Sequence, residues 1–384
     1  MYEGRKYLMN CFPYSHISVL VMPTDFCNMN CVYCFNGRKT CKEKKVISDE
    51  TLKKIFQIVI PFYSEVKFIW HGGEPLSMGM EFYERVVELQ NEFNINNISI
   101  QNTVQTNLTL LDKKFADFLV ENNFHVGSSF DGIMQNEATR HNTDRILKGH
   151  EILKSSGGRN GFICVVQNKN IDYLVDDYEW FKSKKINYTH NMYLTDSPQD
   201  NELFVPEDKY VSKMCDFFDY WMFDKRCNIR VSYFETFLKY ILHKEKDLCC
   251  YNSCMGKHIG IHFDGSIFGC NRDFPDEYCF GNVYDYEDIH ECFRSGGFNS
   301  LLSKAVKRRN HCREVCDIYD FCAGGCNSTA LAGGNIEKNN EYICETMRAV
   351  YKYIEEKVEP WREEREDRIR ERLNPYLVEM LIKK

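Results

Sequence analysis

The chain has 384 residues, a length that predicts two or three domains. Its 49 Lys and Arg against 56 Asp and Glu give a formal net charge of −7, which argues against a broad nucleic-acid-binding surface. No apolar run approaches the roughly 18 residues that span a bilayer, and the N-terminus lacks the apolar stretch of a signal peptide. We therefore expect a cytoplasmic protein with neither a membrane nor a nucleic acid as partner.

Short apolar runs alternate with helical patterns over the first 240 residues. Strands are predicted at residues 17–22, 66–70, 98–104, 125–130, 162–166 and 188–193. Helices are predicted after a Ser48 cap and at 81–92, 112–122, 145–154 and 172–184. Strand and helix repeated about six times predict an α/β fold with a parallel sheet. Six units are too few for a closed eight-fold barrel, which leaves a partial (β/α)6 TIM-like barrel or a doubly wound sheet.

The pattern changes at about residue 244. Up to residue 344 cysteines and glycines are frequent and long periodic helices are absent, which predicts a separate domain folded around metal. Residues 362–372 contain five Arg and five Asp or Glu, which is typical of a solvated helix. The predicted domains are therefore 1–240, 241–345 and a helical C-terminal tail at 346–384.

Cysteine is the most informative residue type. There are 19, an odd number, so complete intrachain pairing is impossible, and without an export signal tight clusters indicate metal ligation. Cys27, Cys31 and Cys34 form C-x3-C-x2-C just after the first predicted strand. Three thiolates can bind one face of an iron–sulfur cubane and leave one iron open. The alternative is a zinc knuckle with a distant fourth ligand.

A second signal follows the second predicted strand, where the sequence reads His71, Gly72, Gly73, Glu74 and Pro75. Two glycines at a strand end permit close backbone approach to a ligand, and proline stiffens the turn. The motif is weak alone, but one strand after a three-cysteine loop it becomes strong.

The two motifs together resemble the radical S-adenosylmethionine superfamily. The resemblance implies the partial barrel, a [4Fe-4S] cluster on Cys27, Cys31 and Cys34, and S-adenosylmethionine on the open iron. It further implies cofactor-binding roles, which would fall to Tyr33, Gly72, Gly73, Glu74, Ser129 and Arg140. Tyr33 would lie against the adenine, the glycine turn would meet the methionyl amine, and Ser129 and Arg140 would hold the carboxylate and ribose side. The alternative for Arg140 is a surface arginine.

The second cysteine field is similar to the SPASM domain of enzymes that modify peptides and proteins. It departs from the SPASM pattern in one place, because three residues rather than two separate Cys312 from Cys316. The resemblance implies two auxiliary [4Fe-4S] clusters, three in all. The first would use Cys249 or Cys250 with Cys254, Cys270 and Cys326, and the second Cys312, Cys316, Cys322 and Cys344.

Overall the chain is similar to anaerobic sulfatase-maturating enzymes, with two departures. Asn271 stands where those enzymes carry the Asp that acts as base, and an amide cannot act as a base. Asp273 shares a face with it in an extended segment and is the predicted catalytic base. The second departure is His71, which replaces Gln before the glycines and is common in SPASM maturases of ribosomal peptides. Those often carry a leader-recognition domain, for which 26 residues before Cys27 leave no room.

Three functions follow. The main prediction is a radical SAM oxidoreductase that abstracts hydrogen from a ribosomal peptide to form a crosslink, a thioether or an oxidised residue. The alternative is formylglycine formation from Cys or Ser of a sulfatase. A third, non-enzymatic alternative is a metal-stabilised scaffold. Both enzymatic functions require a peptide or protein substrate and a reductant such as flavodoxin or ferredoxin, and the first also allows a separate leader-binding protein.

Overall fold

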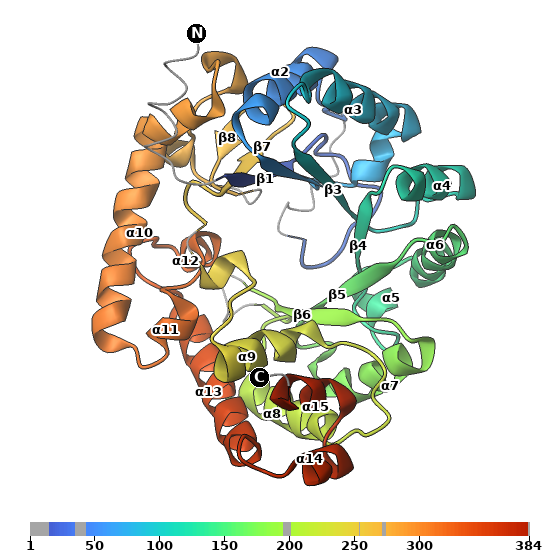
Figure 1. Ribbon diagram of the computed structural model, residues 1–384, viewed down its shortest axis with the longest axis vertical. Helices are drawn as coiled ribbons and strands as arrows, with labels where there is room; N and C mark the ends of the chain where they lie inside the picture. Colours follow the sequence, from blue (N-terminus) through green and yellow to red (C-terminus); the bar gives the residue numbers. More distant parts are fainter. Residues whose placement is uncertain (1–14, 35–43, 195–200, 253, 271–273, 383–384) are drawn as a thin grey trace. The chain divides into compact units, whose positions relative to one another are not determined.

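The computed structural model describes residues 15–34, 44–194, 201–252, 254–270 and 274–382 (Figure 1). Its contacts divide the chain into two compact units. Unit 1 holds residues 1–128, 144–160 and 253–306, and unit 2 holds residues 129–143, 161–252 and 307–384. The two units are defined by contacts in space and each combines separate stretches of the sequence. The three sequence domains at 1–240, 241–345 and 346–384 remain a prediction.

Unit 1 is built on a mainly parallel sheet. Its strands are β1 (His16–Val21), β2 (Glu65–Trp70), β3 (Ser99–Thr106), β4 (His125–Ser129), β7 (His258–Ile261) and β8 (Ile267–Phe268). They lie in the order β4-β3-β2-β1-β7-β8, and all neighbours are parallel except β7 and β8. Its helices are α2 (Asp49–Val59), α3 (Met80–Phe93), α4 (Lys113–Glu121) and α6 (Thr143–Ser155). The helices start where their caps predict, since Ser48 accepts from the Thr51 N–H and Asp112 from the Phe115 N–H.

The core of unit 1 forms because alternate strand residues point to the helices. In β2 the side chains of Val66, Phe68 and Trp70 are fully buried, and the residues between them are not. Phe56 of α2 meets Phe68 edge-on at 5.1 Å between ring centroids, and Tyr83 of α3 meets Trp70 edge-on at 6.0 Å. Each such buried ring contributes roughly 2–3 kcal/mol to folding, so this aromatic layer fixes β2 in place.

One polar cluster is buried in the same layer. Asn102 of β3 accepts hydrogen bonds from Trp70 Nε1 and Gln90 Nε2, each at 3.0 Å, and donates to Gln90 Oε1 at 2.8 Å. The three side chains therefore satisfy one another, and they fix β2, β3 and α3 in a single register.

Unit 2 contains a parallel strand pair, β5 (Asn160–Val166) and β6 (Tyr188–Met192), and is otherwise helical. Its helices are α5 (Asn136–Thr139), α7 (Leu174–Lys184), α8 (Glu207–Met222), α9 (Ser232–His243), α11 (Tyr319–Cys322), α12 (Asn327–Ala332), α13 (Glu341–Val358), α14 (Glu366–Arg372) and α15 (Pro375–Ile382). The 20-residue α10 (Gly296–Val315) begins in unit 1 and ends in unit 2. Short 3-10 helices are η1 (Ile60–Phe62), η2 (Pro75–Met78), η3 (Ile171–Tyr173), η5 (Cys249–Tyr251), η6 (Asp276–Tyr278), η7 (Val283–Asp285), η8 (Ile289–Arg294) and η9 (Glu359–Trp361).

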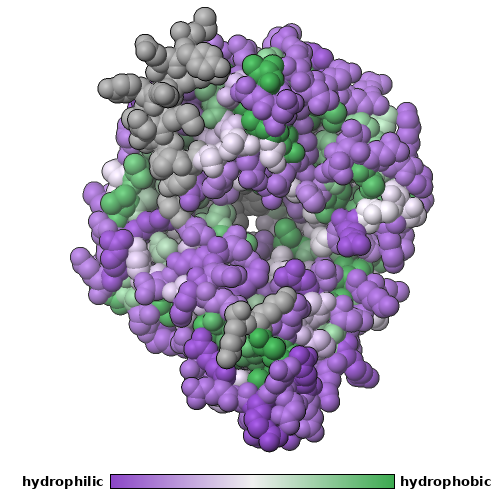
Figure 2. Space-filling view, in the orientation of Figure 1, coloured by the Kyte–Doolittle hydropathy of each residue, from purple (hydrophilic) through white to green (hydrophobic). Residues whose placement is uncertain are grey.

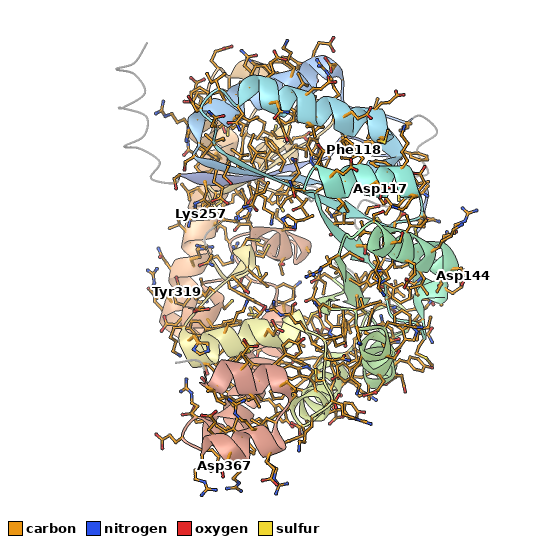
Figure 3. All side chains as sticks on the ribbon, turned by 45° about the vertical axis from the view of Figure 1, so that its right-hand side comes forward. Asp117, Phe118, Asp144, Lys257, Tyr319 and Asp367 are labelled. Atoms are coloured by element: carbon orange, nitrogen blue, oxygen red, sulfur yellow. The ribbon has the colours of Figure 1, made fainter. Side chains whose placement is uncertain are left out.

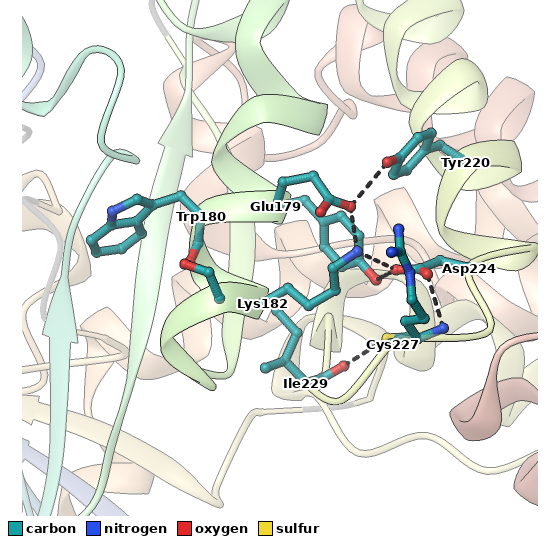
Figure 4. Close-up of polar contacts among 10 residues, drawn as sticks. Glu179, Trp180, Lys182, Tyr220, Asp224, Cys227 and Ile229 are labelled. Atoms are coloured by element: carbon teal, nitrogen blue, oxygen red, sulfur yellow. Dashed lines mark hydrogen bonds and ion pairs between the residues drawn. The ribbon is translucent and has the colours of Figure 1, made fainter.

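A buried lysine joins α7 to the segment after α8 (Figure 4). Lys182 is 9% exposed and donates to Asp224 Oδ2 at 2.7 Å and to Glu179, while Tyr220 donates to Glu179 at 2.9 Å. Two carboxylates compensate the buried ammonium, so breaking either pair would leave a charge without its partner.

The predicted α/β class with a parallel sheet is confirmed, and each of the six predicted strands is present within two residues of its expected ends. The expectation that residues 244–344 lack long helices is wrong, because α10 spans 20 of them. Its buried face runs through Phe298, Leu301, Ala305, Arg308 and Cys312, and the charged Arg308 interrupts the apolar periodicity that would indicate a helix. β7 and β8 were also missed, since runs of four and two residues fall below the usual length of a strand signal.

Figure 2 shows a largely hydrophilic surface on this face of the molecule. No helix in the described part of the chain is long and apolar enough to cross a bilayer.

Replacing Asn102 by Ala tests the buried polar cluster. The change leaves the Trp70 N–H and one end of the Gln90 amide buried without partners, so we expect a loss of about 3 kcal/mol in unfolding free energy. Urea denaturation followed by tryptophan fluorescence measures it. Gln101→Ala, at the preceding position of β3, is the control and should lower the unfolding free energy by less than about 0.5 kcal/mol. Equal losses in the two variants would contradict the assignment.

Candidate functional site

The three-cysteine loop leaves the carboxyl end of β1 in unit 1. Cys31 is buried, and Cys27 and Cys34 are partly buried. The Met29 N–H donates to Cys27 Sγ at 3.4 Å, and the Cys34 N–H donates to the Cys31 carbonyl at 3.2 Å. The segment from Cys31 to Cys34 thus forms a turn, and Cys27 is tied to the loop through the Met29 N–H.

The glycine turn after β2 lies directly against this loop. The Gly73 N–H donates to the Thr24 carbonyl at 3.0 Å, and the Glu74 N–H donates to the Phe26 carbonyl at 2.7 Å. A Cβ on Gly73 would lie 2.0 Å from the Phe26 oxygen, and a Cβ on Gly72, whose φ is +107°, would lie 2.7 Å from the Thr24 oxygen. Only glycine fits at either position, so the close approach of these two backbones is what the Gly-Gly pair provides.

The Glu74 carboxylate is buried beneath the turn and is held by protein donors. Its Oε1 accepts from the Leu76 N–H at 2.9 Å and from the Thr106 hydroxyl at 2.6 Å, and its Oε2 accepts from the Asn107 N–H at 2.8 Å. Glu74 therefore connects the end of β2 to the end of β3, and we assign it the role of positioning the turn.

The loop after β3 closes the connection back to the cysteines. Asn107 Nδ2 donates to Asn28 Oδ1 at 2.9 Å, and Asn28 Nδ2 donates to Thr109 Oγ1 at 2.8 Å. Asn28 stands between Cys27 and Cys31 in sequence, so the cysteine loop, the glycine turn and the β3 loop form one hydrogen-bonded unit.

The electrostatics of the loop favour a bound cationic centre. Burial, with smaller contributions from the nearby charges of Glu74, Cys31 and Cys34, raises the pKa of Cys27 to about 12, although the hydrogen bond from the Met29 N–H lowers it. A metal centre displaces such thiol protons on binding, because only thiolates are ligands. Three closely spaced sulfurs on one loop fit the iron–sulfur interpretation. Within the described ranges no three potential ligands converge tightly on a single ion, so the side-chain positions alone do not separate an iron–sulfur cluster from a zinc site.

The other predicted cofactor contacts are distributed between the two units. Tyr33 is partly buried in unit 1, whereas Ser129 at the end of β4 and Arg140 belong to unit 2. Arg140 is only 8% exposed, so the surface-arginine alternative is wrong. The predicted base Asp273 and its neighbour Asn271 lie outside the described residues.

Four cysteines of unit 2 surround one cavity of about 580 Å³, which we call the four-cysteine cavity. Its sulfur-bearing lining residues are Cys312, Cys316, Cys322 and Cys344. Cys312 lies near the end of α10 and Cys316 just after it, Cys322 ends α11, and Cys344 lies in the first turn of α13. Tyr319 of α11, which also lines the cavity, is labelled in Figure 3. Burial raises the pKa of Cys322 to about 11 and of Cys344 to about 12, and in both the neighbouring thiols add to the shift. The grouping matches the second ligand set implied by the SPASM resemblance.

A buried arginine braces the segments around this cavity. Arg308 of α10 is 1% exposed and donates to the carbonyls of Gly324 at 2.9 Å and Ile336 at 2.5 Å, and to Asn327 Oδ1 at 2.6 Å. Its planar guanidinium thereby links the loop after Cys322 to the segment before α13.

The other predicted auxiliary ligands are less clearly grouped. Cys250 in η5 is partly buried, and its pKa is raised by desolvation and by the nearby thiols of Cys249 and Cys326, whereas Cys249 is exposed. Cys254 and Cys270 are partly buried in unit 1. Cys249 and Cys250, between which the sequence left the choice open, therefore differ in exposure.

Several residues that hold these sites together belong to no sequence motif. Thr106 and Asn107 are ordinary residues at a strand end, and Arg308 lies in a mixed-charge helix. Their roles depend on contacts with residues about 16 to 33 positions away, which single-sequence patterns do not indicate.

The chain was compared with known proteins. Residues 21–181 match the family model of the radical SAM superfamily. A cysteine-type anaerobic sulfatase-maturating enzyme of Clostridium perfringens is 27% identical over 361 residues, covering 88% of this chain and 96% of the relative. A serine-type enzyme of Bacteroides thetaiotaomicron is also 27% identical, over 88% of each chain.

Solved structures give the same result. The structure of anSMEcpe with bound AdoMet matches with a TM-score of 0.81 and 25% identity, covering 90% of this chain and 98% of that one. Streptococcus suis SuiB bound to its precursor peptide SuiA matches with a TM-score of 0.59 at 14% identity, which supports the fold alone.

These comparisons exclude the scaffold alternative, and they favour the sulfatase-maturation alternative over the ribosomal-peptide prediction. They also establish that a [4Fe-4S] cluster and S-adenosylmethionine are the cofactors of this family. The chain is therefore a radical SAM enzyme and a homologue of the anaerobic sulfatase-maturating enzymes.

Proposed function

We propose that this enzyme oxidises a Cys or Ser of a sulfatase to formylglycine. The observation that carries the proposal is the cysteine loop hydrogen-bonded to the Gly72–Glu74 turn, in a chain that covers 96% of a cysteine-type sulfatase maturase. A peptide substrate is supported by related structures with bound peptides. Crosslinking of a ribosomal peptide, with a separate leader-binding protein, is the less favoured function.

The chain's own residues hold and orient the cofactors in this proposal. Cys27, Cys31 and Cys34 bind the cluster, and Gly73 offers backbone groups to the methionyl end of S-adenosylmethionine. When bound, the cluster and S-adenosylmethionine supply the radical that abstracts a substrate hydrogen. Glu74 acts through its hydrogen bonds, because it keeps the turn and the β3 loop against the cysteine loop.

Tyr33, Ser129 and Arg140 complete the proposed cofactor contacts, with the adenine, ribose and carboxylate groups as their partners. Because Arg140 is buried, its side chain serves either to contact a ligand or to stabilise the fold, and it is not a solvent-exposed surface residue. Asp273 is proposed as the base that takes the proton from the substrate thiol or hydroxyl, with Asn271 unable to do so.

Two auxiliary [4Fe-4S] clusters are also proposed, three clusters in all. The second would occupy the four-cysteine cavity, whose four thiols and volume of about 580 Å³ suit one closed cluster. For the first we favour Cys250 over Cys249, because Cys250 is the less exposed of the two and lies near enough to Cys326 for the Cys326 thiol to raise its pKa. Cys254 and Cys270 would complete that set. An external reductant such as flavodoxin or ferredoxin would supply electrons to the enzyme.

The proposed reaction is tested with sulfatase peptides. Anaerobically reconstituted enzyme, S-adenosylmethionine and a reductant should convert a peptide with Cys or Ser in a C/S-x-P/A-x-R context to formylglycine, read by mass spectrometry. The same peptide with Ala at the reactive position is the control. Asp273→Asn should still cleave S-adenosylmethionine but lose product. Cleavage without any peptide conversion by the unaltered enzyme would reject sulfatase maturation.

The choice between Cys249 and Cys250 is tested by iron analysis. Cys250→Ser should lose up to one cluster, about four irons per chain, whereas Cys249→Ser should keep the full content. The two adjacent substitutions are matched in chemistry, so a difference reports position alone. A larger iron loss in Cys249→Ser would reverse the assignment.

Replacing Glu74 by Gln tests the positioning role. The Gln side chain carries an NH2 group in place of one carboxylate oxygen. That NH2 group would face either the Asn107 N–H or the Leu76 and Thr106 donors, so at least one hydrogen bond is replaced by a repulsive contact between two donors. We expect about 2 kcal/mol of lost stability and at least tenfold weaker binding of S-adenosylmethionine, measured by equilibrium dialysis on the iron-loaded enzyme. Glu81→Gln, a first-turn residue of α3, is the control. Unchanged affinity in Glu74→Gln would remove Glu74 from the site.

A further inference from the structure

Two side chains donate hydrogen bonds to sulfurs of the four-cysteine cavity. Asn339 Nδ2 lies 2.8 Å from Cys312 Sγ, and Arg348 Nη2 lies 3.9 Å from Cys316 Sγ. Both residues line the cavity. The sequence patterns single out neither of them, because neither belongs to a cysteine motif.

The placement of Arg348 follows from the helix that also carries a cysteine. Cys344 and Arg348 are four residues apart on α13, so their side chains lie on the same face. The guanidinium is held by carboxylates, since Nη1 donates to Glu345 Oε1 at 3.1 Å and Nε lies 3.4 Å from Asp317 Oδ1. These contacts fix its orientation and leave Nη2 directed at Cys316.

Asn339 is placed by the end of the loop before the same helix. The next residue, Asn340, caps α13 by accepting from the Ile343 N–H at 3.3 Å. Arg308 holds the preceding segment through the Ile336 carbonyl at 2.5 Å. The chain is therefore held in place on both sides of Asn339. The hydrogen bond from Asn339 to Cys312 is the shorter of the two hydrogen bonds to sulfur.

Hydrogen bonds to ligand sulfurs change the redox properties of a cluster. A donor withdraws electron density from the thiolate and stabilises the more negative, reduced state. A guanidinium adds positive charge, which acts in the same direction.

We propose that Asn339 and Arg348 are positioning residues that raise the reduction potential of the cluster bound by Cys312, Cys316, Cys322 and Cys344. The inference rests on the proposed function in one respect, that this cavity holds a [4Fe-4S] cluster. It adds to that function, because it assigns the control of this cluster's reduction potential to two named residues.

The test is a redox titration of the full chain followed by electron paramagnetic resonance. A background with Cys27, Cys31 and Cys34 replaced by Ala removes the signal of the S-adenosylmethionine cluster. Asn339→Leu and Arg348→Leu should each lower the equilibrium constant for reduction of one cluster about tenfold, or ~59 mV for one electron. Arg348→Lys keeps the charge and should show a smaller shift. The other auxiliary cluster is an internal reference and should not move.

Lys338 provides the matched control. It lines the same cavity and is exposed, and in the described structure its side chain has no hydrogen bond to a cysteine sulfur. Lys338→Gln removes a nearby positive charge without removing a bond to sulfur, so its shift should stay under threefold. An equal shift in Lys338→Gln would attribute the effect to general charge and overturn the proposal.

Iron content separates the remaining outcomes. If the unaltered protein holds no iron that depends on Cys312 and Cys344, the cluster assignment itself fails. If the cluster is present and its potential is unchanged in Asn339→Leu and Arg348→Leu, only the present inference fails. Should Asn339→Leu lose the cluster, Asn339→Asp preserves the size of the side chain and must still lower the potential. Loss of the cluster in every variant would assign these residues to cluster retention and reject tuning.

Discussion

The arrangement of unit 1 around the cysteine loop depends on one buried carboxylate. Glu74 satisfies two backbone N–H groups and one hydroxyl, which come from the turn after β2 and from the end of β3. These donors would otherwise be buried without partners at the point where two parallel strands end. The same turn carries Gly73, and Asn107 carries the connection on to Asn28. The Glu74 carboxylate therefore connects the glycine turn and the β3 loop to the loop that carries the three cysteines.

Much of unit 1 could be predicted because its signals are local. Ser48 and Asp112 cap their helices as predicted, and alternation in β2 gives the buried face correctly. The three-cysteine loop and the Gly-Gly pair were found for the same reason, since strand ends in a parallel sheet bring such motifs to one edge. The actual contact between them, through Thr24 and Phe26, could not be predicted, because it joins carbonyls that no side chain identifies.

The cysteine-rich part was less predictable. The ligand grouping at the four-cysteine cavity follows from resemblance alone, and the structure places the same four residues around one cavity. The helix that carries Cys312 is not indicated by the sequence, because α10 is only weakly amphipathic and the charged Arg308 lies on its buried face among Leu301 and Ala305. A buried guanidinium bonded to backbone carbonyls depends on the folded path of three segments, and a sequence pattern contains no such information. The same holds for Asn339 and Arg348.

The brace formed by Arg308 has a consequence for the cluster proposed in the four-cysteine cavity. Because the guanidinium ties the loop after Cys322 to the segment before α13, the fold itself holds the segments that carry the four cysteines around one cavity. The entropic cost of bringing these segments together is therefore met by the folding of the polypeptide. The proposed cluster would then enter a site that the protein has already formed, in contrast to zinc fingers, whose chain remains unfolded until the ion binds.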